Sequence, residues 1–171
     1  MGLIKRISVL LLVNVCCLSL FACGGGAKSP VTEVVGNWKL TYVERIITDD
    51  LEAEQSAVQY SGETVQSQIS EKPAQGNVFV LVRLIIEKEQ SGAAAFSWDQ
   101  LTIQDADGNR YARMENDSFL ESYGYTRQKM TDLTLGKNEG YICFELPDQA
   151  ASGTITLCYE AEDDSCSIPI T

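Results

Sequence analysis

Hydrophobic and polar residues alternate along several short segments of the chain. In residues 38–42, three large apolar side chains are separated by Lys39 and Thr41. The same period of two recurs in residues 101–104, 141–146 and 155–159. This spacing places alternate side chains on opposite faces of a strand, so it predicts strands that each bury one face.

One segment is apolar on both faces. Residues 78–86 read VFVLVRLII, with Arg83 as the single polar residue. A strand of this kind is covered on both sides, so we predict that it is central in its sheet. Further along, Asp107-Gly108 supplies the positive φ angles of a tight hairpin turn.

Two longer segments lack a sustained period. Residues 48–76 are polar and acidic, and we interpret them as a long, partly ordered loop with one short strand at most. Residues 114–129 are mixed and aromatic and predict a helical turn, and residues 133–135 predict a short strand. Many alternating strands without a strong amphipathic helix predict an all-β fold, an antiparallel β-sandwich.

The N-terminus has the three parts of a secretory signal. Lys5 and Arg6 precede an apolar run over residues 7–21, which is short for a helix that spans the membrane. The run ends in Leu20-Phe21-Ala22-Cys23, which resembles the lipobox of bacterial lipoproteins. The resemblance implies cleavage before Cys23 and a diacylglyceryl group on its sulfur. An uncleaved anchor helix and ordinary signal cleavage are the alternatives.

This organisation predicts three parts. Residues 1–22 are a cleaved lipoprotein signal peptide, residues 23–35 are the lipidated Cys and a flexible tether, and residues 36–171 are the sandwich domain. We therefore expect an extracytoplasmic protein that is anchored to the cell membrane by acyl chains on Cys23.

Composition excludes several functions. Removal of residues 1–22 takes away two basic residues and no acid, so the net charge changes from −11 to −13. Phosphates repel such a chain, so we expect no nucleic-acid partner. The chain has no histidine, which excludes the usual Ser-His-Asp and Cys-His sites and the commonest zinc ligand. We expect no cofactor and no metal centre.

Three stretches carry a second resemblance: GNVFVLVRLIIEKEQ, WDQLTIQDADGNRY and LGKNEGYICFELPDQAASGTITLCY. They are similar to a domain-of-unknown-function family of bacterial surface lipoproteins. The likeness covers residues 36–159 and implies a telokin-like, immunoglobulin-like sandwich. The chain departs from the family pattern at Glu87-Lys88-Glu89, where an Asn is usual. Members share no established catalytic site, so the resemblance implies no functional residue.

Asp105, Asp107 and Asn109 have the spacing of a calcium loop. The EF-hand pattern fails because Arg110 and Asn116 occupy the positions of its Gly and Glu. The Asp-Gly turn is therefore the favoured interpretation, and a weak calcium site at Asp105 and Asp107 is the alternative.

The cysteines of the sandwich domain allow one disulfide. If the apolar side chains of their strands face the core, both Cys143 and Cys158 face outward. Pairing Phe144 with Leu157 would then set Cys143 opposite Cys158, so we predict a possible disulfide between them, with Cys166 as a buried inward thiol. Three free thiols are the alternative, because disulfide geometry is demanding.

The favoured functional hypothesis is a non-catalytic binding module. It would contact a protein, a peptide or an envelope component through residues 48–76 and 114–129, because sandwich scaffolds present functional loops. One alternative is a hydrolase of envelope sugars or peptides that uses paired carboxylates. Its candidate acids are Glu52, Glu54, Glu63, Glu71, Asp163 and Asp164. A purely structural or envelope-stress accessory protein is another alternative.

Overall fold

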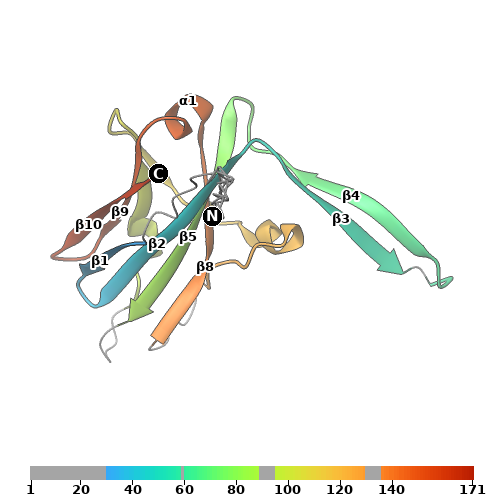
Figure 1. Cartoon of the computed structure of the whole chain (residues 1–171), viewed down its shortest axis with the longest axis horizontal. Helices are drawn as coiled ribbons and strands as arrows, with labels where there is room; N and C mark the ends of the chain where they lie inside the picture. The colour runs from blue at the N-terminus through green and yellow to red at the C-terminus, as the bar shows by residue number, and fades with distance from the viewer. Residues whose placement is uncertain (1–29, 59, 89–94, 130–135) are drawn as a thin grey trace, which may run out of the picture.

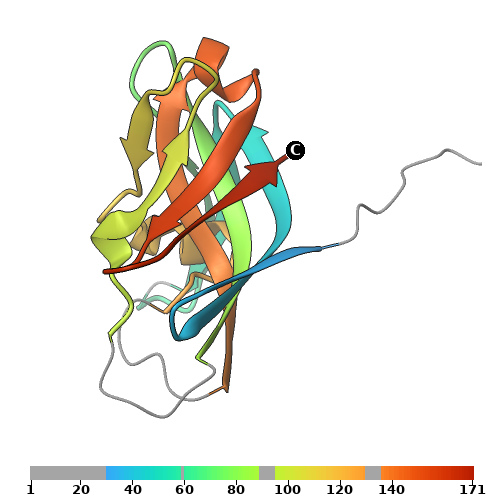
Figure 2. The same cartoon turned by 90° about the vertical axis from the view of Figure 1, so that its left-hand side faces the viewer.

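The chain folds into two packed antiparallel sheets with a separate hairpin (Figures 1 and 2). The computed structural model describes residues 30–58, 60–88, 95–129 and 136–171. The first sheet has the order β1-β2-β5-β8 and the second has the order β10-β9-β6-β7, while β3 and β4 pair only with each other. This architecture confirms the predicted antiparallel β-sandwich.

The elements, in chain order, are β1 (Val31–Val35), β2 (Trp38–Thr48), β3 (Leu51–Val58), β4 (Thr64–Glu71), β5 (Asn77–Lys88), the 3₁₀ helix η1 (Trp98–Gln100), β6 (Leu101–Gln104), β7 (Arg110–Ala112), the 3₁₀ helix η2 (Ser118–Tyr123), β8 (Gly136–Pro147), α1 (Asp148–Ala151), β9 (Ile155–Glu160) and β10 (Ser165–Ile170).

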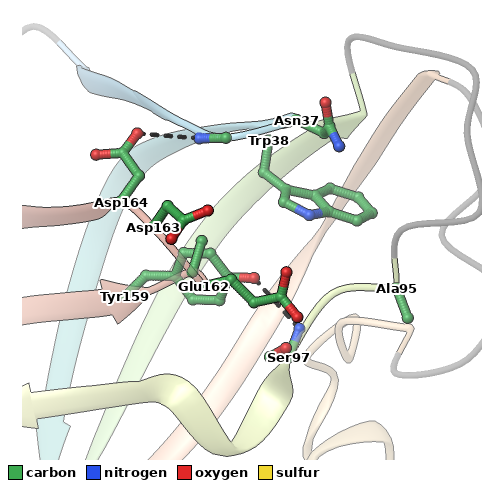
Figure 3. A pocket seen from close by; sticks show the side chains of 10 residues that line it. Asn37, Trp38, Ala95, Ser97, Tyr159, Glu162, Asp163 and Asp164 are labelled. Atoms are coloured by element: carbon green, nitrogen blue, oxygen red, sulfur yellow. Dashed lines mark hydrogen bonds between the residues drawn. The ribbon is translucent and has the colours of Figure 1, made fainter.

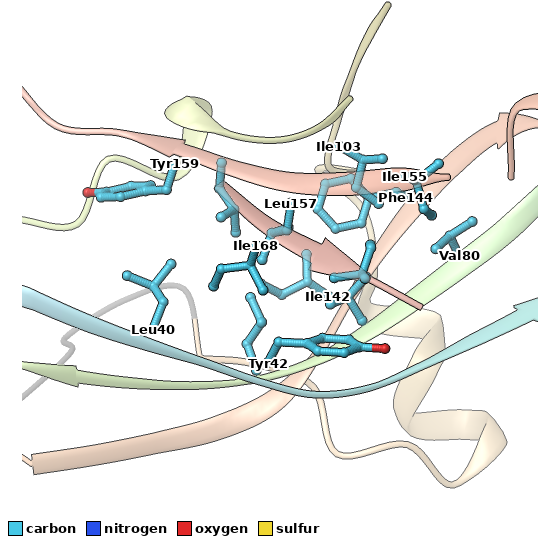
Figure 4. Packing of buried hydrophobic residues seen from close by; sticks show 14 of the residues in the cluster. Leu40, Tyr42, Val80, Ile103, Ile142, Phe144, Ile155, Leu157, Tyr159 and Ile168 are labelled. Carbon is cyan, nitrogen blue, oxygen red and sulfur yellow. The ribbon is translucent and has the colours of Figure 1, made fainter. Parts of the chain in front are cut away.

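The core lies between the two sheets (Figure 4). Alternate side chains of β2, β5 and β8 meet alternate side chains of β6, β9 and β10 there. They include Leu40, Tyr42, Val80, Ile142 and Phe144 from the first sheet and Ile103, Ile155, Leu157, Tyr159 and Ile168 from the second. Each large apolar side chain contributes roughly 1.5–3 kcal/mol on burial. The period of two in the sequence is therefore the pattern that forms this core.

Strand β5 is the centre of the first sheet. It lies between β2 and β8, and it buries both of its faces. Val80 and Val82 face the sandwich core, whereas Phe79 and Leu81 pack on the outer face under Leu120 of η2. These contacts confirm the prediction of a central strand covered on both sides.

The described part of the chain begins earlier than the predicted domain. Residues 31–35, expected at the end of the tether, form β1 and pair with β2 through a turn at Gly36, whose φ is +55°. The tether prediction is wrong here because the buried side chain of Val35 ties this segment to the core.

Several expectations concern other parts of the chain. Cys23, the signal peptide and the predicted strand at residues 133–135 lie outside the described residues. Within the described residues, no helix is long and apolar enough to span a membrane.

Candidate functional site

The segment predicted as a long loop is a β-hairpin. Strands β3 and β4 pair antiparallel along their whole lengths, from Leu51 opposite Glu71 to Val58 opposite Thr64. They follow β2 and precede β5, and they project away from the sandwich (Figure 1). We call residues 51–71 the arm. The prediction of a partly ordered loop over residues 48–76 is therefore wrong.

The arm has one apolar face and one polar face. Residues opposite each other in an antiparallel pair share a face. The register therefore groups Leu51, Ala53 and Ala57 with Val65 and Ile69, on a face that Gln55, Ser67 and Glu71 also share. The opposite face carries acidic and amide side chains, namely Glu52, Glu54, Gln66 and Gln68. Residues 51–71 together contain four Glu and no Lys or Arg.

The base of the arm packs against the sandwich, whereas its outer half is exposed to solvent. Leu51 is only 4% exposed and packs in the cluster of Phe79, Leu81 and Leu120, and Lys72 forms a 2.9 Å ion pair with Asp50. Farther out, Val65 is 41% exposed. The sandwich thus holds the arm in place while part of its apolar face meets solvent.

The edges of the arm differ from the edge of the first sheet. The open edge of β8 is covered, because Met114 N donates to Cys143 O at 2.8 Å and Gln128 N donates to Tyr141 O at 2.9 Å. In the part of the chain that the structure describes, the outer edges of β3 and β4 have no strand beside them. Unpaired edges expose backbone donors and acceptors to a partner.

The aromatic segment 114–129 is used differently from the arm. Its helical turn is η2, and Leu120 is fully buried on the outer face of the first sheet. Phe119, Tyr123 and Tyr125 pack around it, with Phe119 at 5.6 Å from Phe79 between ring centroids. These aromatic side chains cover the sheet, so the arm is the better candidate contact surface.

A pocket of about 390 Å³ lies at one end of the sandwich (Figure 3). Trp38 lines it but is only 3% exposed, because Phe96 packs edge-on against its ring. Asp164 holds the local turn, since its carboxylate accepts from Gly36 N at 3.1 Å and from Ser165 N at 2.9 Å. Glu162 and Asp163 are the other acids that line the pocket.

The candidate acids of the hydrolase hypothesis are therefore divided between two places. Glu52, Glu54, Glu63 and Glu71 belong to the arm, whereas Asp163 and Asp164 line the pocket. Trp98 lies in η1 and packs partly buried against the core. The four Glu of the arm are therefore separated along the chain and in the fold from the two Asp of the pocket, and Trp38 is buried.

The Asp-Gly turn between β6 and β7 is formed as predicted, with Gly108 at a φ of +88°. The carboxylate of Asp105 accepts from the Asn109 side chain at 2.9 Å, from Tyr111 Oη at 2.8 Å and from two backbone N–H groups. The Asn109 bond in particular holds the pKa of Asp105 below its usual value. Both carboxylate oxygens of Asp105 therefore accept hydrogen bonds within the turn. Among the described residues, no group of three metal-ligating side chains occurs. These contacts favour the turn over a calcium site at Asp105 and Asp107.

The predicted Cys143–Cys158 disulfide is wrong. Cys143 lies in β8 and Cys158 in β9, which belong to different sheets, and Phe144 lies opposite Val80 instead of Leu157. Cys143, Cys158 and Cys166 are free thiols. Cys143 packs 3.5 Å from Met114 Sδ, and burial raises its pKa to about 12. Cys166 packs against the core, as its inward phase predicted, but it is half-buried and not fully buried.

Comparison with known proteins supports the fold alone. No protein-family model matches the chain, and no curated protein sequence matches it. The crystal structure at 2.2 Å of a conserved hypothetical protein from Bacillus anthracis is similar, with a TM-score of 0.52 and 15% identity. The match covers 82% of this chain and 92% of that protein. An uncharacterized β-sandwich protein from Clostridium difficile 630 matches with a TM-score of 0.45 and 13% identity, over 82% of this chain and 90% of its own.

Proposed function

We propose that this chain is a lipid-anchored, extracytoplasmic binding module of the telokin-like, immunoglobulin-like lipoprotein family. It is non-catalytic, and it contacts a protein, a peptide or an envelope component through the arm. The observation that carries this proposal is the arm itself, which projects from a well-packed sandwich with two unpaired edges and a partly bare apolar face.

The physical argument concerns the stability of two-stranded sheets. An isolated two-stranded hairpin is at best marginally stable in water, and a third strand or a packing partner is needed for independent stability. Outside its base, the arm has neither in the described residues. An extended segment that added to one edge would supply the missing backbone hydrogen bonds, which is the β-augmentation mode of recognition.

The position outside the membrane follows from the lipobox resemblance at Cys23. Each buried methylene contributes about 0.8 kcal/mol, so two or three acyl chains on one residue hold a protein firmly at a bilayer. We expect metabolic labelling with a fatty acid to mark the full chain. Cys23→Ser should abolish the label and release the protein from the envelope.

Cys17→Ser is the matched control, because Cys17 lies in the apolar run without a lipobox before it. This variant should keep the label and stay bound. An unlabelled wild-type chain, or a Cys23→Ser variant that stays bound, would contradict the anchor.

The contact surface is tested by removing the arm. Replacing residues 52–70 of the full chain with a two-residue Asn-Gly turn should abolish protein crosslinks in intact cells. The sandwich should still melt cooperatively, because only the base of the arm packs on it.

Asp163→Asn in the pocket is the matched control and should leave the crosslinks unchanged. If the arm-replaced chain keeps its crosslinks while Asp163→Asn loses them, the pocket and not the arm is the contact surface.

A further inference from the structure

The two edges of the arm are not equivalent. Strand β3 carries Glu52 and Glu54 in the half nearest the sandwich, and charged residues of this kind protect an edge from unwanted pairing. Strand β4 is uncharged from Thr64 to Ser70 and contains no Pro or Lys. The edge of β4 is therefore the one that lacks the usual protection against another strand.

The sequence of β4 reads almost the same in both directions. From Thr64 to Ser70 it is Thr-Val-Gln-Ser-Gln-Ile-Ser, so chemically similar residues lie at equal distances on either side of Ser67. Two copies of such a strand are self-complementary when they pair antiparallel. That is the requirement for a two-fold interface between identical chains.

We propose that β4 pairs antiparallel with β4 of a second copy of this chain, with Ser67 opposite Ser67. The pairing joins the two arms into a four-stranded sheet in the order β3-β4-β4-β3. This inference rests on the proposed function in one respect, since it takes the arm as a contact surface. It adds that the partner at the edge of β4 is a second copy of the chain.

The register is selected by the side chains that it brings together. With Ser67 on the two-fold axis, Val65 lies opposite Ile69 of the second copy and Gln66 lies opposite Gln68. A slip of one residue would place the apolar face of one arm beside the polar face of the other. A slip that centres the pairing on Gln68 or Gln66 would set Val65 against Glu71 or Ile69 against Glu63.

Charge also favours this edge. In the proposed pairing, Glu52 and Glu54 lie on the outer strands, away from the axis. Glu63 and Glu71 of the two copies meet only at the ends of the paired segment. The alternative pairing of β3 with β3 would bring Glu52 and Glu54 of both copies to the junction, where opposed like charges are destabilising.

The interface is small. Seven paired residues bury less surface than the roughly 1,600 Å² of a standard protein–protein interface. We therefore expect a weak dimer in dilute solution and a populated one where the chains are concentrated, as they are on a membrane surface. The test below uses the full chain in its own membranes for this reason.

The first experiment introduces a cysteine at the axis. Directly opposed residues of antiparallel strands have Cα atoms about 4.5–5.5 Å apart, which lies within the range that a disulfide spans. Ser67→Cys should therefore give a disulfide-linked species of twice the chain mass on mild oxidation in membranes. Gln55→Cys is the matched control, because Gln55 lies directly opposite Ser67 on β3 and hence on the outer edge. It should stay at the level of the wild-type chain.

The second experiment uses charge exchange between two tagged copies of the full chain. Ser67→Lys in both copies, or Ser67→Glu in both, should abolish co-purification. One copy with each substitution should restore it. Gln55→Lys in both copies should leave co-purification at the wild-type level.

Failure to restore co-purification in the mixed pair, or equal crosslinking of Ser67→Cys and Gln55→Cys, would overturn the inference. If Ser67→Cys crosslinks instead to a protein of different mass, the partner at β4 is not a second copy of this chain. That result would overturn this inference but not the proposed function. The proposed function fails separately, if replacement of residues 52–70 leaves all crosslinks in place.

Discussion

A hydrogen-bonded cluster lies on the outer face of the first sheet. Tyr141 Oη donates to Glu44 Oε1 at 2.7 Å, and Arg83 Nη1 donates to the same oxygen at 3.1 Å. Burial, followed by the bond to Glu44, raises the pKa of Tyr141 to about 12. The neutral phenol is therefore the form that the folded chain stabilises.

This shift predicts a pH dependence of stability at high pH. A group whose folded pKa is raised stabilises the fold fully below its unfolded pKa, near 10 for tyrosine, and loses that contribution as pH rises toward 12. Tyr141→Phe should lower the free energy of unfolding by about 1 kcal/mol at pH 8. The difference from wild type should vanish between pH 10 and 12.

Urea unfolding at several pH values measures this difference, and tyrosinate absorbance follows the phenol itself. Tyr125→Phe is the matched control, because Tyr125 packs edge-on against Tyr141 and should leave the late-titrating phenol in place. Burial also raises the pKa of Tyr42 and of Tyr159, so the readout is the loss of one late-titrating phenol in Tyr141→Phe. An unchanged number of late-titrating phenols would contradict the assignment to Tyr141.

At the scale of elements, the covering of β8 depends on one glycine. Residues 126–128 run parallel to the edge of β8 beside Gly140, where Tyr141 N donates to Thr126 O at 2.8 Å and Gln128 N donates back to Tyr141 O. A Cβ on Gly140 would lie 2.4 Å from Gln128 N and 2.6 Å from Arg127 C. Both contacts are with backbone, so they cannot be relieved by a change of rotamer.

We therefore expect Gly140→Ala to destabilise the chain by about 1–3 kcal/mol, the range for overpacking. Gly153→Ala is the matched control, because its nearest backbone atom would lie at 3.4 Å, and its effect should stay within about 0.5 kcal/mol. Midpoints of urea unfolding compare the two variants. Equal midpoints for the two variants would contradict this expectation, because they would mean that residues 126–128 move away from the added Cβ without lowering the free energy of unfolding.

The same scale shows which elements the sequence predicts. Strands β2, β5 and β8 are recognisable because large apolar residues mark their buried positions. The arm is not, because Ala53 and Ala57 form part of its apolar face and Gln55 and Ser67 interrupt it. Its signals are a period of two that includes alanine and the turn at Gly62, whose φ is +84°.

At the scale of the whole molecule, the class of fold is predictable and the strand neighbours are not. The alternation of apolar and polar residues correctly predicts that the side chains of Cys143 and Cys158 point away from the sandwich core and that the side chain of Cys166 points toward it. This succeeds because the face on which a side chain lies depends only on its neighbours along the strand. It gave no information on which strands pair, so Cys143 and Cys158 were assigned to adjacent strands although they lie in different sheets. The candidate site depends on the same nonlocal information, since the arm is exposed only because no other described segment packs against its outer half.

The position of β5 between β2 and β8 has a consequence for the order of folding. As the chain emerges N-terminus first, β2 and β5 can pair as soon as both are free, but β8 follows only after residues 89–135. Pairing across so long a separation is entropically slow. Until it happens, the most apolar strand of the chain has one edge and both faces incompletely covered, so the emerging chain is most prone to aggregate, and most in need of a chaperone, before Pro147 has emerged.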